Sequence, residues 1–263
     1  MEVVEPAFLA DVAQFAAGSG GVAASGRRGG GVRRGEGWGV VAGAAEASRG
    51  AVRRVIRNYF PQDPVFDGGC SAGLLPSGRV WLVDPLGGAV NFALGLGLWS
   101  VSVAAVQGGE VVAGAVWVPP DVLHAAWADG PALRAGSVMR PSAVRVLEDA
   151  VVSVVVAPEF AAAASECVRR LAPRVRGVRV FCSGALELCC LASGKLDACV
   201  WPSPVPPGAA AGALVARRAG CDVVALDGMP YRPGEGRGVL AAVTSVLAGV
   251  LLELLSGIRW EEQ

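Results

Sequence analysis

Apolar residues follow a helical period near the N-terminus of the chain. They recur at helical spacing from residue 44 to residue 59, and Pro61 follows closely, so we expect a helix that stops before this proline. The preceding residues 18–39 are rich in glycine and arginine and cannot bury apolar surface. They are expected to form a flexible loop between two helices. A phosphate-binding loop is the alternative, but no G-K-[ST] sequence follows these glycines.

Beyond this helix the period shortens to that of strands. Short runs rich in β-branched residues are separated by turn signals such as residues 107–109 and 119–121. This pattern predicts a meandering, largely antiparallel sheet. The runs are residues 80–83, 101–106, 111–118, 123–127 and 151–156.

The second half of the chain alternates helices with strands, which indicates a layered α/β (α+β) fold. Thr244 and Glu253 interrupt the apolar residues 239–255, which favours a buried C-terminal helix over a membrane span. Residues 1–150 and 151–263 are expected to be two halves of one compact unit. The other predicted helices are residues 160–171, 185–193 and 209–219, and the strands are residues 178–181, 198–201 and 221–226.

Composition limits the partners and the compartment. The 23 basic and 23 acidic residues cancel, so no global field would attract nucleic acid or an anionic membrane. The N-terminus lacks the regions of a signal peptide, which favours a cytoplasmic protein. Seven cysteines, with no C-x-x-C spacing among the four in residues 182–199, fit a reduced protein. The single histidine, His124, argues against a zinc site and is expected to serve packing.

One segment, residues 81–92, carries a recognisable motif. It reads Trp-Leu-Val-Asp-Pro-Leu-Gly-Gly-Ala-Val-Asn-Phe. This sequence resembles the W-x-V-D-P-x-D-G-T-x-N-F signature of the inositol monophosphatase superfamily, whose members are Mg²⁺-dependent phosphatases. The resemblance implies an αβαβα sandwich, and a homodimer of the kind that many relatives form. Further segments resemble family motifs in the same order: residues 60–63, 114–119, 182–189 and 207–220.

The positions that hold metal in that family are replaced almost throughout. Gly87 and Ala89 stand where the signature has its second aspartate and its threonine. Mg²⁺ is held by several carboxylates in near-octahedral geometry, so one surviving aspartate cannot assemble such a site. We therefore expect neither a metal nor another cofactor. The other replaced positions are Val41, Ala44, residues 68–70 and Gly208.

Asp84 is the surviving carboxylate and the first catalytic candidate. It follows an apolar strand, and without cationic neighbours its desolvation should raise its pKa and suit it to general acid or base work. Capping the following helix is the alternative role. Asp67 could supply a second catalytic carboxylate if its loop is displaced.

A turn is the first expected contact for a small-molecule ligand. Gly87, Gly88 and Ala89 lie where the strand gives way to a helix, so their N–H groups could hold a phosphate, sulfate or carboxylate. The alternative is a glycine-rich turn that binds nothing.

A loop and an aromatic residue are further expected ligand contacts. Cys182, Ser183 and Gly184 match the substrate loop of the family, although without a histidine partner the cysteine and the serine are weak nucleophiles. Trp201 falls where relatives often place a glutamate. Its ring would suit a flat or apolar ligand, or would fill the space that the missing ligands leave.

The selective loss of metal ligands leaves three functional hypotheses. The first is a metal-independent biosynthetic enzyme of bacterial specialised metabolism, of the cyclase, isomerase or lyase type, acting on a small, partly apolar intermediate. The second is a pseudoenzyme, a pseudophosphatase that binds a phosphorylated metabolite or a partner protein. The third is a residual phosphatase.

Overall fold

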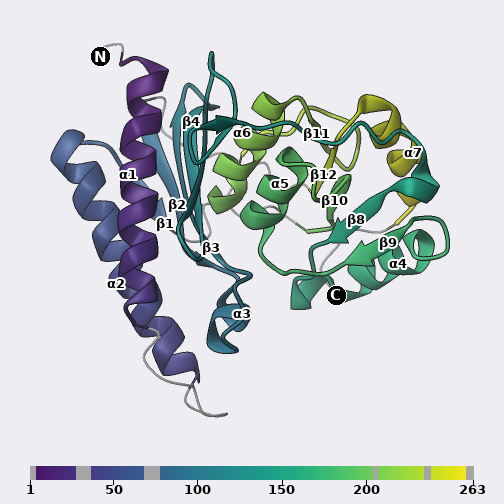
Figure 1. The fold of residues 1–263 in the computed structure, drawn as a ribbon, viewed down its shortest axis with the longest axis horizontal. Helices are drawn as coiled ribbons and strands as arrows, with labels where there is room; N and C mark the ends of the chain where they lie inside the picture. Colours follow the sequence, from purple (N-terminus) through teal and green to yellow (C-terminus); the bar gives the residue numbers. More distant parts are fainter. Residues whose placement is uncertain (1–3, 28–36, 68–77, 204–206, 234–237, 259–263) are drawn as a thin grey trace.

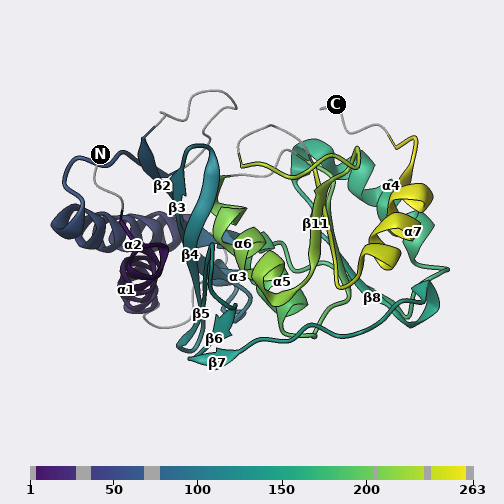
Figure 2. The ribbon, with the colours of Figure 1, turned by 90° about the horizontal axis from the view of Figure 1, so that it is seen from above.

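The computed structural model describes residues 4–27, 37–67, 78–203, 207–233 and 238–258. Layers of helix and sheet alternate across the molecule (Figure 1), which confirms the predicted layered fold. Helices α1 (Pro6–Ser25) and α2 (Gly37–Tyr59) cover the outer face of a seven-stranded sheet. Figure 2 shows α5 (Gly184–Ala192) and α6 (Ala210–Ala219) between this sheet and a five-stranded one. Beyond the second sheet lie α4 (Ala161–Leu171) and α7 (Ser245–Leu255).

The seven-stranded sheet has its strands in chain order. The first two strands are parallel and all later neighbours are antiparallel, so the predicted meander is confirmed over most of its length. Very short strands at both edges were not predicted, because two or three residues show no clear period. The strands are β1 (Val65–Asp67), β2 (Arg79–Gly87), β3 (Ser100–Gln107), β4 (Glu110–Val118), β5 (Val122–Trp127), β6 (Leu133–Arg134) and β7 (Ser137–Val138).

The five-stranded sheet has the order β11-β12-β10-β8-β9. The prediction that residues 151–156 join the antiparallel meander is wrong, because β8 lies in this second sheet with parallel neighbours on both sides. Val152, Ser153 and Val154 are all fully buried, as expected for a strand covered on both faces. The strands are β8 (Val151–Val154), β9 (Gly177–Arg179), β10 (Ala198–Trp201), β11 (Asp222–Ala225) and β12 (Val239–Ala242).

The glycines of α1 are helical, so the prediction of a flexible loop over residues 18–39 is wrong for residues 18–25 and 37–39. Residues 28–36 lie outside the described residues. A Cβ on Gly21 would lie 2.1 Å from the ring of Trp117, and one on Gly20 would lie 2.8 Å from Ser48 and Val52. These glycines therefore serve the close approach of α1 to β4 and α2.

The apolar residues 239–255 contain a strand and a helix, so the prediction of one long C-terminal helix is wrong. β12 inserts between β10 and β11 with antiparallel register. The strand ends at Ala242, and the hydroxyl of Thr244 then accepts a hydrogen bond from the Leu247 N–H at the start of α7. None of the described helices has the length and apolarity to span a membrane.

Successive side chains of β2 point to opposite faces of the sheet, and this alternation sets the direction of Asp84. Trp81 and Val83 pack in the core under α1 and α2, whereas Val80 and Leu82 pack in the core against α5 and α6. Asp84 continues the second set. It therefore faces the middle of the molecule.

Candidate functional site

Asp84 lies near the end of β2, at the point where the strand turns toward α3 (Ala89–Ala93). Its Oδ1 accepts a hydrogen bond of 3.1 Å from the Leu86 N–H. The residue keeps some exposed surface, but its carboxyl group is surrounded by protein. Burial raises the pKa of Asp84 to about 6, and the Leu86 hydrogen bond opposes this rise only in part. The carboxyl group is thus poised to exchange a proton near neutral pH.

Gly208 closes the space beside Asp84. It lies in a short 3-10 helix, η3 (Pro207–Ala209), whose Gly208 carbonyl accepts a hydrogen bond from the Ser102 hydroxyl on β3. A Cβ on Gly208 would lie 2.3 Å from the Cβ of Asp84. Backbone thus occupies the place where the resemblance implies a second metal-binding aspartate.

Gly87 and Gly88 bring the backbone close to Asp84 and to the next loop. A Cβ on Gly87 would lie 2.7 Å from Oδ2 of Asp84. Gly88 has a φ of 92°, and a Cβ there would lie 2.7 Å from the carbonyl oxygen of Leu98. Ala89 then begins α3, which has only five residues. So short a helix contributes little dipole, and anion binding at this turn stays a prediction.

The predicted loop at residues 182–184 meets this turn. The Ser183 hydroxyl donates a hydrogen bond of 3.2 Å to the Gly87 carbonyl and lies 3.4 Å from the Ser100 hydroxyl. Cys182 is exposed and adopts a φ of 54°. Asn91 holds the two segments together, because its Nδ2 donates to the carbonyls of Leu98 (2.8 Å) and Phe181 (2.5 Å). The structure therefore brings the glycine turn and this loop together.

Trp201 lies in the core beside the loop. Its ring covers Gly184, where a Cβ would lie 2.0 Å from a ring carbon, and the residue is only 7% exposed. The absence of a side chain at Gly184 makes room for this ring. Its role as a wall for a ligand stays a prediction.

Glu187 holds the loop through a hydrogen bond from the Ser183 N–H, and the sequence did not predict this residue as part of the site. The residue is fully buried on α5. Its carboxylate accepts hydrogen bonds from the Ser153 hydroxyl (2.6 Å), the Ser183 N–H (3.3 Å) and the Cys199 thiol (3.6 Å). Burial raises the pKa of Glu187 despite these hydrogen bonds. The available signal was one acidic residue in an otherwise apolar helical segment.

Asp67 and Asp84 lie on opposite faces of the sheet, so the structure does not bring these two carboxylates together. Asp67 pairs with Val83 across β1 and β2, which turns it toward α2. There it forms ion pairs with Arg49 (2.7 Å) and Arg53 (3.0 Å). Two guanidinium groups thus engage Asp67.

The residues at the site do not fit the Mg²⁺ cluster that the resemblance implies. Val41 and Ala44 are buried apolar residues, and the matched positions 87 and 208 are glycines. The described part of the chain contains no group of three or more His, Cys, Asp or Glu residues able to hold a metal. Residues 68–77 and 204–206 lie outside the described residues, and their sequence contains no Asp, Glu or His. Among the described residues and these two segments, the set of hard oxygen ligands is therefore too small for the cluster.

His124 is buried on β5, as expected for a packing role. The residue is 5% exposed, and burial lowers its pKa to about 4. A neutral imidazole in the sheet is consistent with the packing interpretation.

Comparison with known proteins gives one consistent result. Residues 12–262 match the model of the inositol monophosphatase family. The chain is 34% identical over 220 residues to the inositol-1-monophosphatase SuhB of Mycobacterium tuberculosis H37Rv, covering 79% of this chain and 74% of the relative. It is 31% identical over 189 residues to a fructose-1,6-bisphosphatase/inositol-1-monophosphatase of Thermotoga maritima, covering 70% and 71% of the two chains.

Solved structures agree with the sequence comparison. The inositol monophosphatase of Anabaena (Nostoc) sp. PCC 7120 has a TM-score of 0.84 at 25% identity, covering 96% of this chain and 97% of the other. Mycobacterium tuberculosis SuhB has a TM-score of 0.80 at 28% identity, covering 98% and 100% of the chains. These matches confirm the predicted sandwich.

The relatives also correct the functional hypotheses. Curated relatives that are 31–34% identical to this chain over the aligned residues are named as phosphatases. This finding contradicts the interpretation of the chain as a metal-independent cyclase, isomerase or lyase, and equally its interpretation as a pseudophosphatase. The family is one of enzymes that act as phosphatases. On this evidence, the chain belongs to the inositol monophosphatase family.

Proposed function

We propose that the chain hydrolyses phosphate monoesters of small polyols, with Asp84 as the general base. One observation carries the proposal: Asp84 remains at the end of β2 within the family fold, with its pKa raised to about 6. The names of the relatives support the reaction class and inositol phosphates or sugar phosphates as substrates. No step is assigned to a metal, because the residues present do not fit one.

The proposed chemistry needs one group that first takes and then returns a proton. The Asp84 carboxylate removes a proton from a water molecule as its oxygen forms a bond to phosphorus. The bond between phosphorus and the polyol oxygen breaks, and the protonated Asp84 returns its proton to that oxygen. The products are the free polyol and inorganic phosphate. A pKa near 6 suits both halves of this exchange at neutral pH.

The substrate is proposed to lie over the joined turn at Gly87 and loop at Cys182, where Cys182 is exposed and Asp84 keeps some exposed surface. The hydrogen bond from Ser183 to the Gly87 carbonyl supports this placement, because it holds the two segments on one side of Asp84. Glu187 acts as a positioning residue through its bond to the Ser183 N–H.

Phosphate release from inositol 1-phosphate and from fructose 1,6-bisphosphate tests the proposal. The expected result is turnover that Asp84→Asn lowers by about 100-fold or more, the usual contribution of a general base. Asp129→Asn changes an exposed aspartate on the turn after β5 and is the matched control, with turnover unchanged. Absence of phosphate release from both substrates would overturn the function. Full activity of Asp84→Asn would overturn the role of this residue.

A cytoplasmic location and a homodimer are further proposals. Six free cysteines among the described residues support a reducing compartment. Light scattering of the purified chain tests the dimer, and a monomeric mass would contradict it.

A further inference from the structure

The outer helix α1 is unusually apolar for a helix on the surface. Asp11 is its single charged side chain in 20 residues. One face packs against α2 and the sheet, yet the opposite face still carries large apolar residues. Phe15 is 58% exposed and Val22, seven residues later, is 65% exposed. Two positions seven apart lie on the same stripe of a helix, so these side chains form an apolar ridge.

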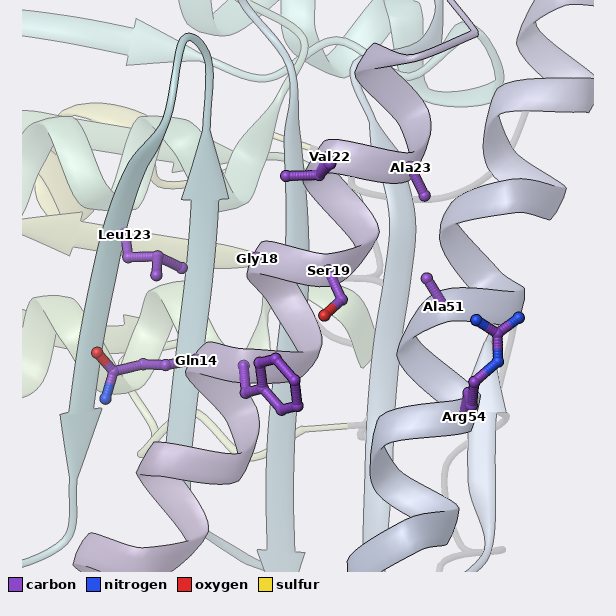
Figure 3. Close-up of a pocket in the computed structure, with 9 residues that line it drawn as sticks. Gln14, Gly18, Ser19, Val22, Ala23, Ala51, Arg54 and Leu123 are labelled. Atoms are coloured by element: carbon purple, nitrogen blue, oxygen red, sulfur yellow. The ribbon is translucent and has the colours of Figure 1, made fainter.

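A groove of about 600 Å³ accompanies this ridge. Figure 3 shows Val22 and Leu123 on one side of α1, and Ala51 and Arg54 on α2 at its other side, with Ser19 on α1 between them. Because Gly18 has no side chain, the helix surface is recessed there between the larger residues. We call this region the outer α1–α2 surface, defined by Phe15, Gly18, Val22, Ala51, Arg54 and Leu123.

Charge is distributed unevenly on this surface. In the described part of the chain, Arg54 lines the groove without an ion pair, and Arg57 lies three residues further along α2, also exposed and without one. By contrast, Arg49 and Arg53 are engaged by Asp67. Among the described residues, the α2 wall of the groove thus offers one guanidinium group without an ion pair, that of Arg54, beside an apolar floor, and Arg57 lies further along the same helix. Carboxylates on an incoming partner would complement them.

We propose that the outer α1–α2 surface binds an amphipathic helix of another protein, with an apolar ridge flanked by carboxylates. A helix laid along α1 can place large apolar side chains over Gly18 and beside Phe15 and Val22, as in other helix-in-groove complexes. Its acidic flank meets Arg54. The face of two helices, roughly 30 Å long and 20 Å wide, covers about 600 Å², which is about three quarters of the roughly 800 Å² that a standard interface uses on each partner.

Fluorescence anisotropy with a synthetic peptide tests this proposal. The probe is a labelled helical peptide of about five turns, with leucines along one face and glutamates beside them. The matched peptide has lysines in place of the glutamates. Saturable binding of the glutamate peptide to the full chain is expected, with binding of the lysine peptide at least about tenfold weaker, as expected for losing a charge-assisted contact.

Three variants locate the binding site. Phe15→Glu and Val22→Glu place a charge on the ridge and are expected to abolish peptide binding, while Arg54→Glu is expected to weaken it about tenfold or more. Val246→Glu is the matched control, because Val246 is 56% exposed on α7 at the other side of the molecule. Circular dichroism and thermal unfolding confirm that each variant folds.

Several results would overturn the proposal. One is no binding of the glutamate peptide at protein concentrations up to about 100 μM, and another is equal binding by Val22→Glu and the parent chain. Sedimentation of the chain with vesicles of phosphatidylcholine and phosphatidylserine, lost in Phe15→Glu, would show that the surface binds lipid instead. A dimer that Phe15→Glu dissociates would show that a second copy occupies it.

Discussion

The backbone of Gly208 packs directly on the side chain of Asp84. A Cβ on Gly208 would lie 2.3 Å from the Cβ of Asp84 and 3.2 Å from its backbone nitrogen. The Ser102 hydroxyl holds η3 in this position through the Gly208 carbonyl. Where the resemblance implies an aspartate, position 208 carries a glycine, which affects the shape of the site as well as its charge. Backbone now fills space beside the surviving carboxylate.

Gly208→Ala should destabilise the fold for this reason. The added methyl group must displace η3 or Asp84, and such overpacking costs about 1–3 kcal/mol. Gly43→Ala is the matched control, because a Cβ at Gly43 on α2 meets nothing within 4 Å. That change should raise stability by up to about 1 kcal/mol. Urea denaturation measures both free energies of unfolding. Equal stability of Gly208→Ala and the parent chain would show that η3 moves freely.

Asp84→Asn should stabilise the protein at neutral pH. The folded state raises the pKa of this carboxyl group from 3.8 to about 6, so it binds more protons than the unfolded state between about pH 4 and pH 6. The contribution of this group to stability is then fully present below about pH 4 and is lost as the pH rises through about 6. Each unit of difference between the folded and unfolded pKa corresponds to about 1.4 kcal/mol, so the loss of stability is about 2–3 kcal/mol. The asparagine variant should lack this loss when unfolding is measured from pH 4 to pH 8.

The rate of phosphate release should depend on the ionisation of Asp84. If Asp84 is the base, kcat/KM rises with pH up to about 6 and is level above it, because the ionised carboxylate is the active form. Steady-state assays between pH 4.5 and pH 8 measure this profile, with pH set by overlapping buffers. A rate that falls as pH rises through 6 would instead assign the protonated form, and hence a general acid, to Asp84.

The sequence predicted most elements of the fold because their periods are long and clear. Two of its errors occur where residues were judged by composition alone. Gly20 and Gly21 suggested flexibility, although in the structure they remove side chains from a tight helix crossing. Thr244 suggested only a polar interruption of a helix, whereas it is the N-cap at a boundary between strand and helix. Such contacts join residues far apart in the chain, so local pattern cannot reveal them.

The candidate site was predicted in part. Asp84, the Gly87 turn and the Ser183 loop come together, because the motif that resembles the family carries their positions. Asp67 could not be placed from the sequence, since a β1 register one residue different would turn it to the other face of the sheet. Glu187 was missed because its partners lie on β8, β10 and the loop before α5, and only the fold assembles them.

Glu187→Gln should keep the fold and most of the activity in the phosphate-release assay. The amide keeps an acceptor for the Ser183 N–H and fits the same space, and the serine at position 153 can rotate to accept a hydrogen bond. Because burial raises the pKa of Glu187, the wild type loses stability as the pH rises above the value of a free glutamate. Glutamine removes that loss, so the variant should gain stability relative to wild type with rising pH. Glu187→Ala, which leaves the Ser183 N–H unpaired, should lose stability and activity together.

Gly21→Ala, on the outer helix α1, should strongly lower the free energy of unfolding. Its methyl group would lie 2.1 Å from the ring of Trp117, which is 1% exposed and is fixed by a hydrogen bond from its Nε1 to Asp121. The ring cannot retreat, so α1 must move away from β4 at a cost of about 1–3 kcal/mol or more. Gly50→Ala on α2, where a Cβ meets nothing within 4 Å, should stabilise by up to about 1 kcal/mol. If thermal unfolding ranked the two variants in the opposite order, the glycines of α1 would be flexible elements after all.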